Sequence, residues 1–119
     1  MENKSIQIIN SIKEKYGEEI TDKYNNNTIS EIVINCISLV KTWFSSIKKP
    51  SELSYEMVLF DKDGNVSETL HGINNDNLSS ALAEKLIVDS HRYSKALVNS
   101  FRYINDSKEV KVIGEIEIS

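Results

Sequence analysis

Apolar residues recur at three- and four-residue steps near the start of the chain, the spacing of one face of an α-helix. Between Glu2 and Tyr16 this face contains Ile6, Ile9 and Ile12, and Gly17 follows where a helix C-cap is expected. The pattern predicts an amphipathic helix over residues 2–16. Residues 18–27 mix isolated apolar positions with turn-forming asparagines, which predicts a loop containing one further helical turn.

The same helical spacing returns after this loop over a wider stripe of apolar residues. Thr28 and Glu31 have the spacing of a capping box, in which each side chain satisfies a free backbone donor at a helix start. Lys48 and Lys49 complement the negative end of a helix dipole, and Pro50 cannot continue a helix. We therefore expect a core helix from Thr28 to Lys49.

Strict alternation of side chains, the pattern of a β-strand, replaces the helical spacing after Pro50. Residues 53–61 predict a strand that is apolar on both faces in its second half, as in the middle of a sheet. The Asp-Gly pair at Asp63 and Gly64 favours a tight turn, and residues 66–71 alternate again. These features predict a β-hairpin.

Leucine and aromatic residues then recur at helical spacing as far as Ile104, which predicts one long helix over residues 76–105. The apolar spacing fails around Asp89 and His91, so we expect a bend at this point. Residues 109–118 alternate as a last strand.

The predicted order of elements is α-α-β-β-α-β, an α+β fold. If the last strand returns beside the first, three mainly antiparallel strands form a sheet in the order 2-1-3, with helices packed on its apolar face. The chain of 119 residues is close to the usual size of one domain, so we expect residues 1–119 to form a single α/β domain.

Composition narrows the class of protein further. Cys36 is the only cysteine, which excludes an internal disulfide, and its apolar neighbours favour a buried thiol. The sequence has no apolar run long enough to span a membrane and no signal-type leader, so we expect a cytoplasmic protein. A net charge of −4 argues against binding to nucleic acid.

The sequence contains no motif that supports catalysis, a cofactor or a metal ion. Asp61, Asp63 and Asn65 resemble the start of a calcium loop, but the glycine and the final glutamate of that loop are misplaced. His71 and His91 lack partners at metal-ligand spacing. The segment around His91 is rich in reactive residue types, but neighbours on a helix point apart, so we interpret it as a solvated helix face and predict no enzyme activity.

Negative charge is concentrated in the segments predicted to form the sheet. Residues 51–77 carry six carboxylates and one lysine, and residues 106–119 carry four carboxylates and two lysines. An acidic sheet surface with apolar residues among its charges could be a solvated face or a docking surface for a basic partner. The predicted partner-binding residues are Glu56, Phe60, Asp61, Asp63, Glu68, Ile113, Glu115 and Glu117.

The leading hypothesis is a small acidic protein that binds and inhibits a basic intracellular protein. A bacterial immunity protein or antitoxin that neutralises a nuclease-type toxin is one example of this class. Two alternatives remain open at this point. One is a small enzyme or ligand-binding protein with a pocket near His91, and the other is a domain that forms a structural homo-oligomer.

Overall fold

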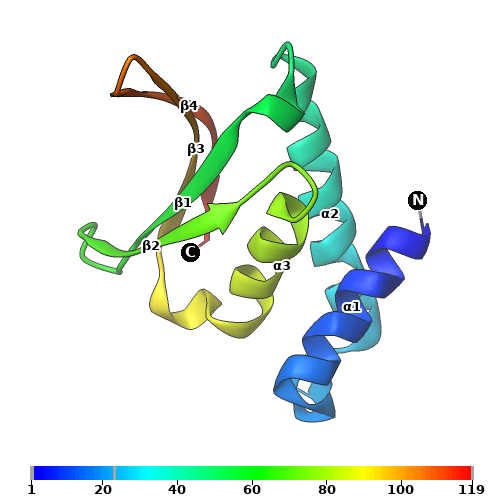
Figure 1. Ribbon diagram of the computed structural model, residues 1–119. Helices are drawn as coiled ribbons and strands as arrows, with labels where there is room; N and C mark the ends of the chain where they lie inside the picture. Colours follow the sequence, from blue (N-terminus) through cyan, green and yellow to red (C-terminus); the bar gives the residue numbers. More distant parts are fainter. Residues whose placement is uncertain (1, 23, 119) are drawn as a thin grey trace.

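A computed structural model describes residues 2–22 and 24–118 (Figure 1), which form an α+β fold. Within them, three α-helices accompany one sheet of four antiparallel strands. The helices are α1 (Glu2–Tyr16), α2 (Asn26–Ser45) and α3 (Leu78–Val88). The strands are β1 (Ser54–Phe60), β2 (Val66–Ile73), β3 (Lys95–Ile104) and β4 (Ser107–Glu117). Short 3₁₀ turns occupy Glu18–Asp22, Pro50–Glu52 and Ser90–Arg92.

The sheet has the strand order β2-β1-β3-β4, so the prediction of three strands in the order 2-1-3 is wrong in this detail. Residues 95–104, predicted to be the second half of a long helix, form β3 next to the central strand β1. The last strand, predicted beside β1, pairs instead with β3 at the edge of the sheet. The α+β class and antiparallel pairing are confirmed.

The long predicted helix ends where its apolar spacing fails. Asp89 caps α3, Ser90–Arg92 form one 3₁₀ turn, and Tyr93 has extended backbone geometry. The apolar residues from Leu97 to Ile104 have helical spacing in the sequence. In the structure this segment is a strand, and alternate residues face opposite sides of the sheet. The missing apolar position marks a boundary between a helix and a strand, not a bend.

Several local predictions are confirmed. Gly17 ends α1 with a positive φ of 85°, and its N–H donates to the carbonyl of Lys13. The β1–β2 hairpin turns at residues 61–65, with Gly64 also at a φ of 85°. Both ends of α2 differ from prediction. Asn25 is the N-cap, and its side chain accepts from the backbone N–H of Thr28 at 2.8 Å. The helix ends at Ser45 instead of Lys49, so no lysine lies in its last turn.

All three helices lie on one side of the sheet, and the β3–β4 hairpin extends away from them (Figure 1). The inner face of the sheet carries Tyr55, Met57, Leu59 and Val98, all buried in one core with residues of α1, α2 and α3. Trp43 of α2 lies over Gly114 of β4, where an added Cβ would overlap the indole ring. Contact of the helices with this one face leaves the opposite face of the sheet uncovered.

No helix in the described part of the chain is both long enough and apolar enough to cross a membrane.

Candidate functional site

The uncovered face of the sheet is the candidate functional site, and strand pairing decides which residues share it. Glu56, Val58 and Phe60 alternate with the buried residues of β1 and therefore point to the outer side. Their partners on β3 are Asn99, Leu97 and Lys95, and these in turn face Val112, Glu115 and Glu117 on β4. We call this surface the outer face.

One end of the outer face is held together by backbone and side-chain bonds of Ser94. Its N–H donates to the carbonyl of Phe60 at 2.8 Å, and its hydroxyl donates to the carbonyl of Asp61 at 2.6 Å. Its own carbonyl accepts from the N–H of Ile118 at 2.8 Å. These bonds bring the β1–β2 turn, the start of β3 and the end of β4 to one place. The carboxylates gathered there, which we call the acidic end, are Asp61, Asp63, Glu115 and Glu117.

Lysines moderate the charge of this end. Lys95 forms an ion pair with Glu115 at 3.2 Å, and its ammonium lies 4.6 Å from the ring centroid of Phe60. Lys62 lies within the turn itself. The side chain of Asp61 accepts from the backbone N–H groups of Asp63 and Asn65, so one of the four carboxylates stabilises the turn. This end therefore presents carboxylates and lysines beside the apolar ring of Phe60.

The middle of the outer face contains a carboxylate that is almost fully covered. Glu56 is 9% exposed, accepts a hydrogen bond from Lys108 at 2.8 Å, and lies 3.4 Å from the side-chain nitrogen of Asn99. The bond from Lys108 holds the pKa of the Glu56 carboxyl below its usual value, although burial opposes this shift. Lys108 also lies 4.4 Å from the ring centroid of Phe101. Glu56 is therefore committed to a network within the fold.

The far end of the outer face is apolar and belongs to the β3–β4 hairpin. Phe101 and Tyr103 pack edge to face, with ring centroids 6.1 Å apart. Phe101 faces Val110 on the neighbouring strand, and Val112 follows two residues later. Tyr103, Val110 and Val112 are 67%, 47% and 55% exposed. The outer face thus carries charged side chains of both signs at one end and apolar side chains at the other.

Two of the predicted partner-binding residues lie elsewhere. Ile113 is the extra residue of a bulge in β4 and packs against the core on the helix side. Glu68 pairs in register with the inward-facing Leu59, so it points to the helix side at the β2 edge. The structure gathers the other six, Glu56, Phe60, Asp61, Asp63, Glu115 and Glu117, on or beside the outer face.

Glu68 forms part of a second polar cluster, between β2 and the end of α3. The hydroxyl of Tyr93 donates to its carboxylate at 2.5 Å, and Lys85 lies 3.5 Å away. The hydrogen bond from Tyr93 lowers the pKa of the Glu68 carboxyl. The pKa of Tyr93 is raised to about 12, mainly by burial and to a smaller extent by the hydrogen bond to Glu68. The cluster joins the sheet edge to α3, because strand, helix and loop each supply one member.

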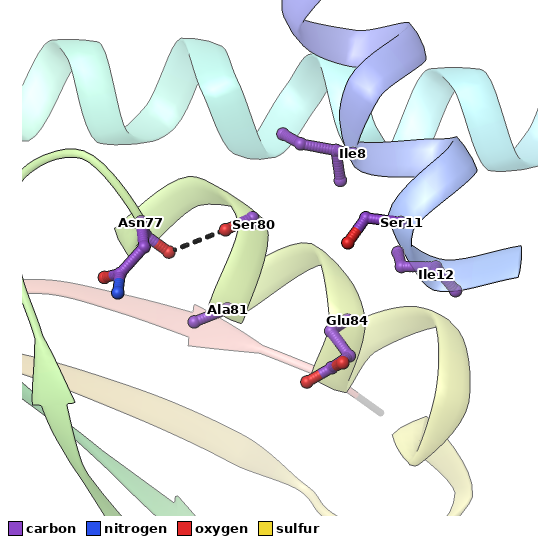
Figure 2. Close-up of a pocket in the computed structure, with 7 residues that line it drawn as sticks. All are labelled: Ile8, Ser11, Ile12, Asn77, Ser80, Ala81 and Glu84. Atoms are coloured by element: carbon purple, nitrogen blue, oxygen red, sulfur yellow. Dashed lines mark hydrogen bonds between the residues drawn. The ribbon is translucent and has the colours of Figure 1, made fainter. Parts of the chain in front are cut away.

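His91, the alternative site of the sequence analysis, is exposed in the 3₁₀ turn after α3. A shallow hollow of about 200 Å³ lies instead between α1 and α3 (Figure 2). Ile8, Ser11 and Ile12 line it from one side and Ser80 and Glu84 from the other, and the hydroxyl of Ser80 is bound to the carbonyl of Asn77. Lys15 pairs with Glu84 at 3.0 Å. These residues supply no nucleophile with an adjacent base.

Among the described residues, no group of three or more histidine, cysteine or carboxylate side chains is placed to hold a metal ion. Cys36 is buried, and its burial raises the pKa of the thiol to about 12, so it is protonated at neutral pH. Searches of protein families, curated proteins and solved structures find no match to this chain. Its candidate site therefore rests on geometry alone.

Sequence reasoning missed the Glu56, Lys108 and Asn99 network and the apolar far end. Both depend on residues 95–104 being a strand, because β3 supplies Asn99, Phe101 and Tyr103 to the outer face. The sequence signal that favours a strand here is the enrichment in β-branched and aromatic residues, namely Val98, Phe101, Tyr103 and Ile104, but their apolar spacing fits a helix as well.

Proposed function

We propose that the protein is a protein-binding module and that the outer face of its sheet docks a basic protein partner. The observation that carries the proposal is the coverage of the sheet by helices on one face only. A sheet face that stays open and presents apolar residues beside unevenly distributed charge has the character of a protein-interaction surface.

Charged and apolar residues of the outer face have different roles in this proposal. The carboxylates of the acidic end favour approach of a basic surface, and steering of this kind raises association rates. Val58, Phe60 and Leu97 lie between this end and the middle of the face, are half-buried, and offer apolar area for the bound state. Inhibition of a basic intracellular enzyme, such as a nuclease toxin neutralised by an immunity protein or antitoxin, is the activity that this combination would serve.

The charge of the face limits how strong the steering is. β3 carries Lys95 and Arg102 and no carboxylate, so the sheet is less acidic than its other three strands indicate. Glu56 is paired with Lys108, and Glu115 with Lys95. We therefore place the steering charge at the acidic end and the main contact area along the apolar residues that follow it.

The test compares two double variants that change the net charge equally. Glu115→Lys with Glu117→Lys alters the acidic end, whereas Glu14→Lys with Glu31→Lys alters exposed positions on α1 and α2. Each tagged protein is used to capture partners from its native cell, and captured proteins are identified by mass spectrometry. We expect a basic protein that the wild type and the helix variant retain and the acidic-end variant loses.

The association rate of that pair should then fall at least tenfold between about 20 mM and 500 mM salt, because salt screens steering charges. Phe60→Ala should speed dissociation with little effect on the association rate. The proposal would be contradicted by a partner that binds the wild type, the acidic-end variant and the helix variant equally, with an association rate that does not change with salt. Glu56 is left out of the design, because its reversal would disturb the network with Lys108 and Asn99.

A further inference from the structure

Among the described residues, the edge of β4 that faces away from β3 pairs with no further strand, and its sequence near the hairpin tip is complementary to itself in charge. Strand β4 pairs with β3 on one side only and ends the sheet. Its first six residues, Ser107–Val112, are exposed, and the regular register of this part is broken only at the bulge beyond Val112. In Figure 1 this hairpin extends away from the helices. An edge of this kind is a template for a further strand.

The hairpin turn decides which backbone groups face outward. Asn105 and Asp106 have φ values of 50° and 68°, the left-handed pair expected in a two-residue type I′ turn. Ile104 and Ser107 therefore close the hairpin as a hydrogen-bonded pair, and hydrogen-bonded and non-bonded pairs alternate from there. It follows that Lys108, Val110 and Val112 direct their backbone N–H and C=O groups away from β3.

A second copy of the same edge fits these groups. We propose that the protein forms a two-fold symmetric dimer through antiparallel pairing of two β4 edges, centred on Val110. In this register Val110 faces its own copy, and Lys108 faces Val112 of the second chain. All outward-directed backbone groups of the segment then meet their counterparts, which is the condition for an antiparallel ladder.

Charge selects this register over its neighbours. With Val110 on the axis, Glu109 of each chain faces Lys111 of the other, so symmetry makes two opposite-charge pairs. Centring on Glu109, Lys111 or Lys108 would place like charges on the axis, and centring on Val112 would bring in the bulge at Ile113. Half-step registers would set outward-directed groups against inward-directed ones.

The side chains of the segment are consistent with this pairing. Lys111 is exposed and has no ion-pair partner among the described residues, while Glu109 lies 3.4 Å from Arg102. The dimer would align Arg102, Glu109 and the second copy's Lys111 in a row of alternating charge across the sheet. On the outer face, Val110 and Phe101 of both copies would form one apolar row.

The other edge of the sheet lacks these properties. Register shifts interrupt the pairing of β2 with β1 at two places, between Tyr55 and Met57 and between Leu59 and Phe60. Bulged edges resist the addition of a strand. Because the β4 contact involves about six residues from each copy, it should be weaker than a standard protein interface and depend on concentration.

The test uses charge reversal with the intact protein and needs no other partner, so its result is independent of the proposed function. Sedimentation equilibrium should show a wild-type mass that rises toward the dimer as concentration increases. Glu109→Lys and Lys111→Glu, each alone, should raise the dissociation constant at least tenfold, since each places like charges opposite one another. The double variant, which exchanges the two charges, should restore wild-type association.

A mixture is the most specific measurement. Glu109→Lys carries two lysines and Lys111→Glu carries two glutamates at the paired positions, so the two variants should bind each other at least as tightly as the wild type binds itself. Fluorescence anisotropy of labelled Glu109→Lys, titrated with each protein, measures this preference. Glu31→Lys serves as the control for net charge and should dimerise like the wild type.

Val110→Pro checks the backbone part of the proposal. Its N–H faces outward, so proline removes no bond to β3 and the variant should keep its far-UV circular dichroism but remain monomeric. A wild type that stays monomeric at about 1 mM would overturn the proposal. A wild-type dimer whose two single reversals associate unchanged, or fail to pair with each other, would overturn it equally, because the interface would lie elsewhere.

Discussion

Gly114 illustrates how one residue sets the contact between a helix and the sheet. It lies on the inner side of β4, and the indole of Trp43 occupies the space where a side chain would be. Trp43 is half-buried and packs against the core, as its position in the apolar stripe of α2 indicates. Only glycine allows a strand and an aromatic ring to approach this closely.

We predict that Gly114→Ala lowers the free energy of unfolding by about 1 to 3 kcal/mol, because the added methyl group forces the indole to move. Trp43→Ala should cost about 3 kcal/mol or more through the lost packing. Urea unfolding of both single variants and of the double variant gives a coupling energy. The double variant should lose less than the two single variants combined, because the overlap disappears with the ring. If the loss of stability in the double variant equals the sum of the two single losses, the ring does not lie on Gly114.

Tyr93 and Glu68 form a second contact whose effect depends on pH. The raised pKa of Tyr93, about 12 against 10.0, means that the folded state favours the neutral phenol. The contribution of the neutral Tyr93 phenol to the free energy of unfolding is therefore complete below pH 10 and is lost as the pH rises toward 12. The carboxyl of Glu68 has a lowered pKa, so its contribution is present above 4.5 and is lost as the pH falls below that value.

Tyr93→Phe should therefore make the free energy of unfolding depend less on pH, both at alkaline and at acidic pH. Urea unfolding measured between pH 9 and 11.5, and again between pH 5 and 3, would show a smaller loss of stability than in the wild type. The alkaline loss should be reduced but not abolished, because burial also raises the pKa of Tyr55. Tyr103→Phe is the control, since this ring is exposed. A profile of Tyr93→Phe that parallels the wild type would contradict the role of this hydrogen bond.

At the scale of elements, local signals placed the end of α1 and the first hairpin turn, but both ends of α2 and the end of α3 differ from prediction. Asn25 accepts from both the N–H and the hydroxyl of Thr28, at 2.8 and 3.0 Å, and the helix starts two residues before the predicted capping box. Asparagine, threonine and serine are all good N-caps, so a run of such residues contains several possible starts. In the structure Asn25 takes this position, with extended backbone geometry.

We expect Asn25→Ala to destabilise the protein by about 1 kcal/mol, because one free backbone donor at the start of α2 loses its acceptor. Asn27→Ala is the matched control. This residue is exposed within the first turn and alanine favours helix, so its replacement should be neutral or slightly stabilising. Chemical unfolding at neutral pH measures both. If the control costs as much as Asn25→Ala, the N-cap assignment is wrong.

At the scale of the whole molecule, the two central strands of the sheet are paired on both sides, whereas the two edge strands are paired on one side. β1 and β3 pair directly over seven residue pairs and lie between the two edge strands. Within the described residues, the helices cover only the inner face and leave the outer face and the β4 edge uncovered. Buried, doubly paired strands open least readily in native proteins, and edges open most readily.

Amide hydrogen exchange should therefore be slowest in β1 and in the first half of β3. Pairing of two β4 edges would change the exchange of specific amides in this strand. As protein concentration rises, exchange at Lys108, Val110 and Val112 should slow, while Glu109 and Lys111, whose amides already bond to β3, should change little. Mass-spectrometric or NMR exchange at two concentrations measures this difference. Uniform slowing along β4, or none, would argue against pairing at this edge.

The sequence alone determined the elements that are defined by short-range chemistry. Helical spacing and Gly17 identified α1, the wide apolar stripe identified α2, and the Asp63-Gly64 pair identified the first hairpin. The spacing did not fix the buried face of α1, since Ile6, which was assigned to that face, is 53% exposed. These features depend on residues a few positions apart, so propensity and turn geometry suffice to predict them. The α+β class and the antiparallel pairing follow from the same signals.

Only the tertiary structure decided the identity of residues 95–104, because their apolar positions fit both a helix and a strand. Pairing with β1, some 40 residues away, selects the strand and thereby adds Lys95, Asn99 and Phe101 to the outer face. The bulge that turns Ile113 inward and the pairing of Glu56 with Lys108 arise from the same register. Hydrogen bonds between strands distant in sequence create these features, so no local pattern specifies them.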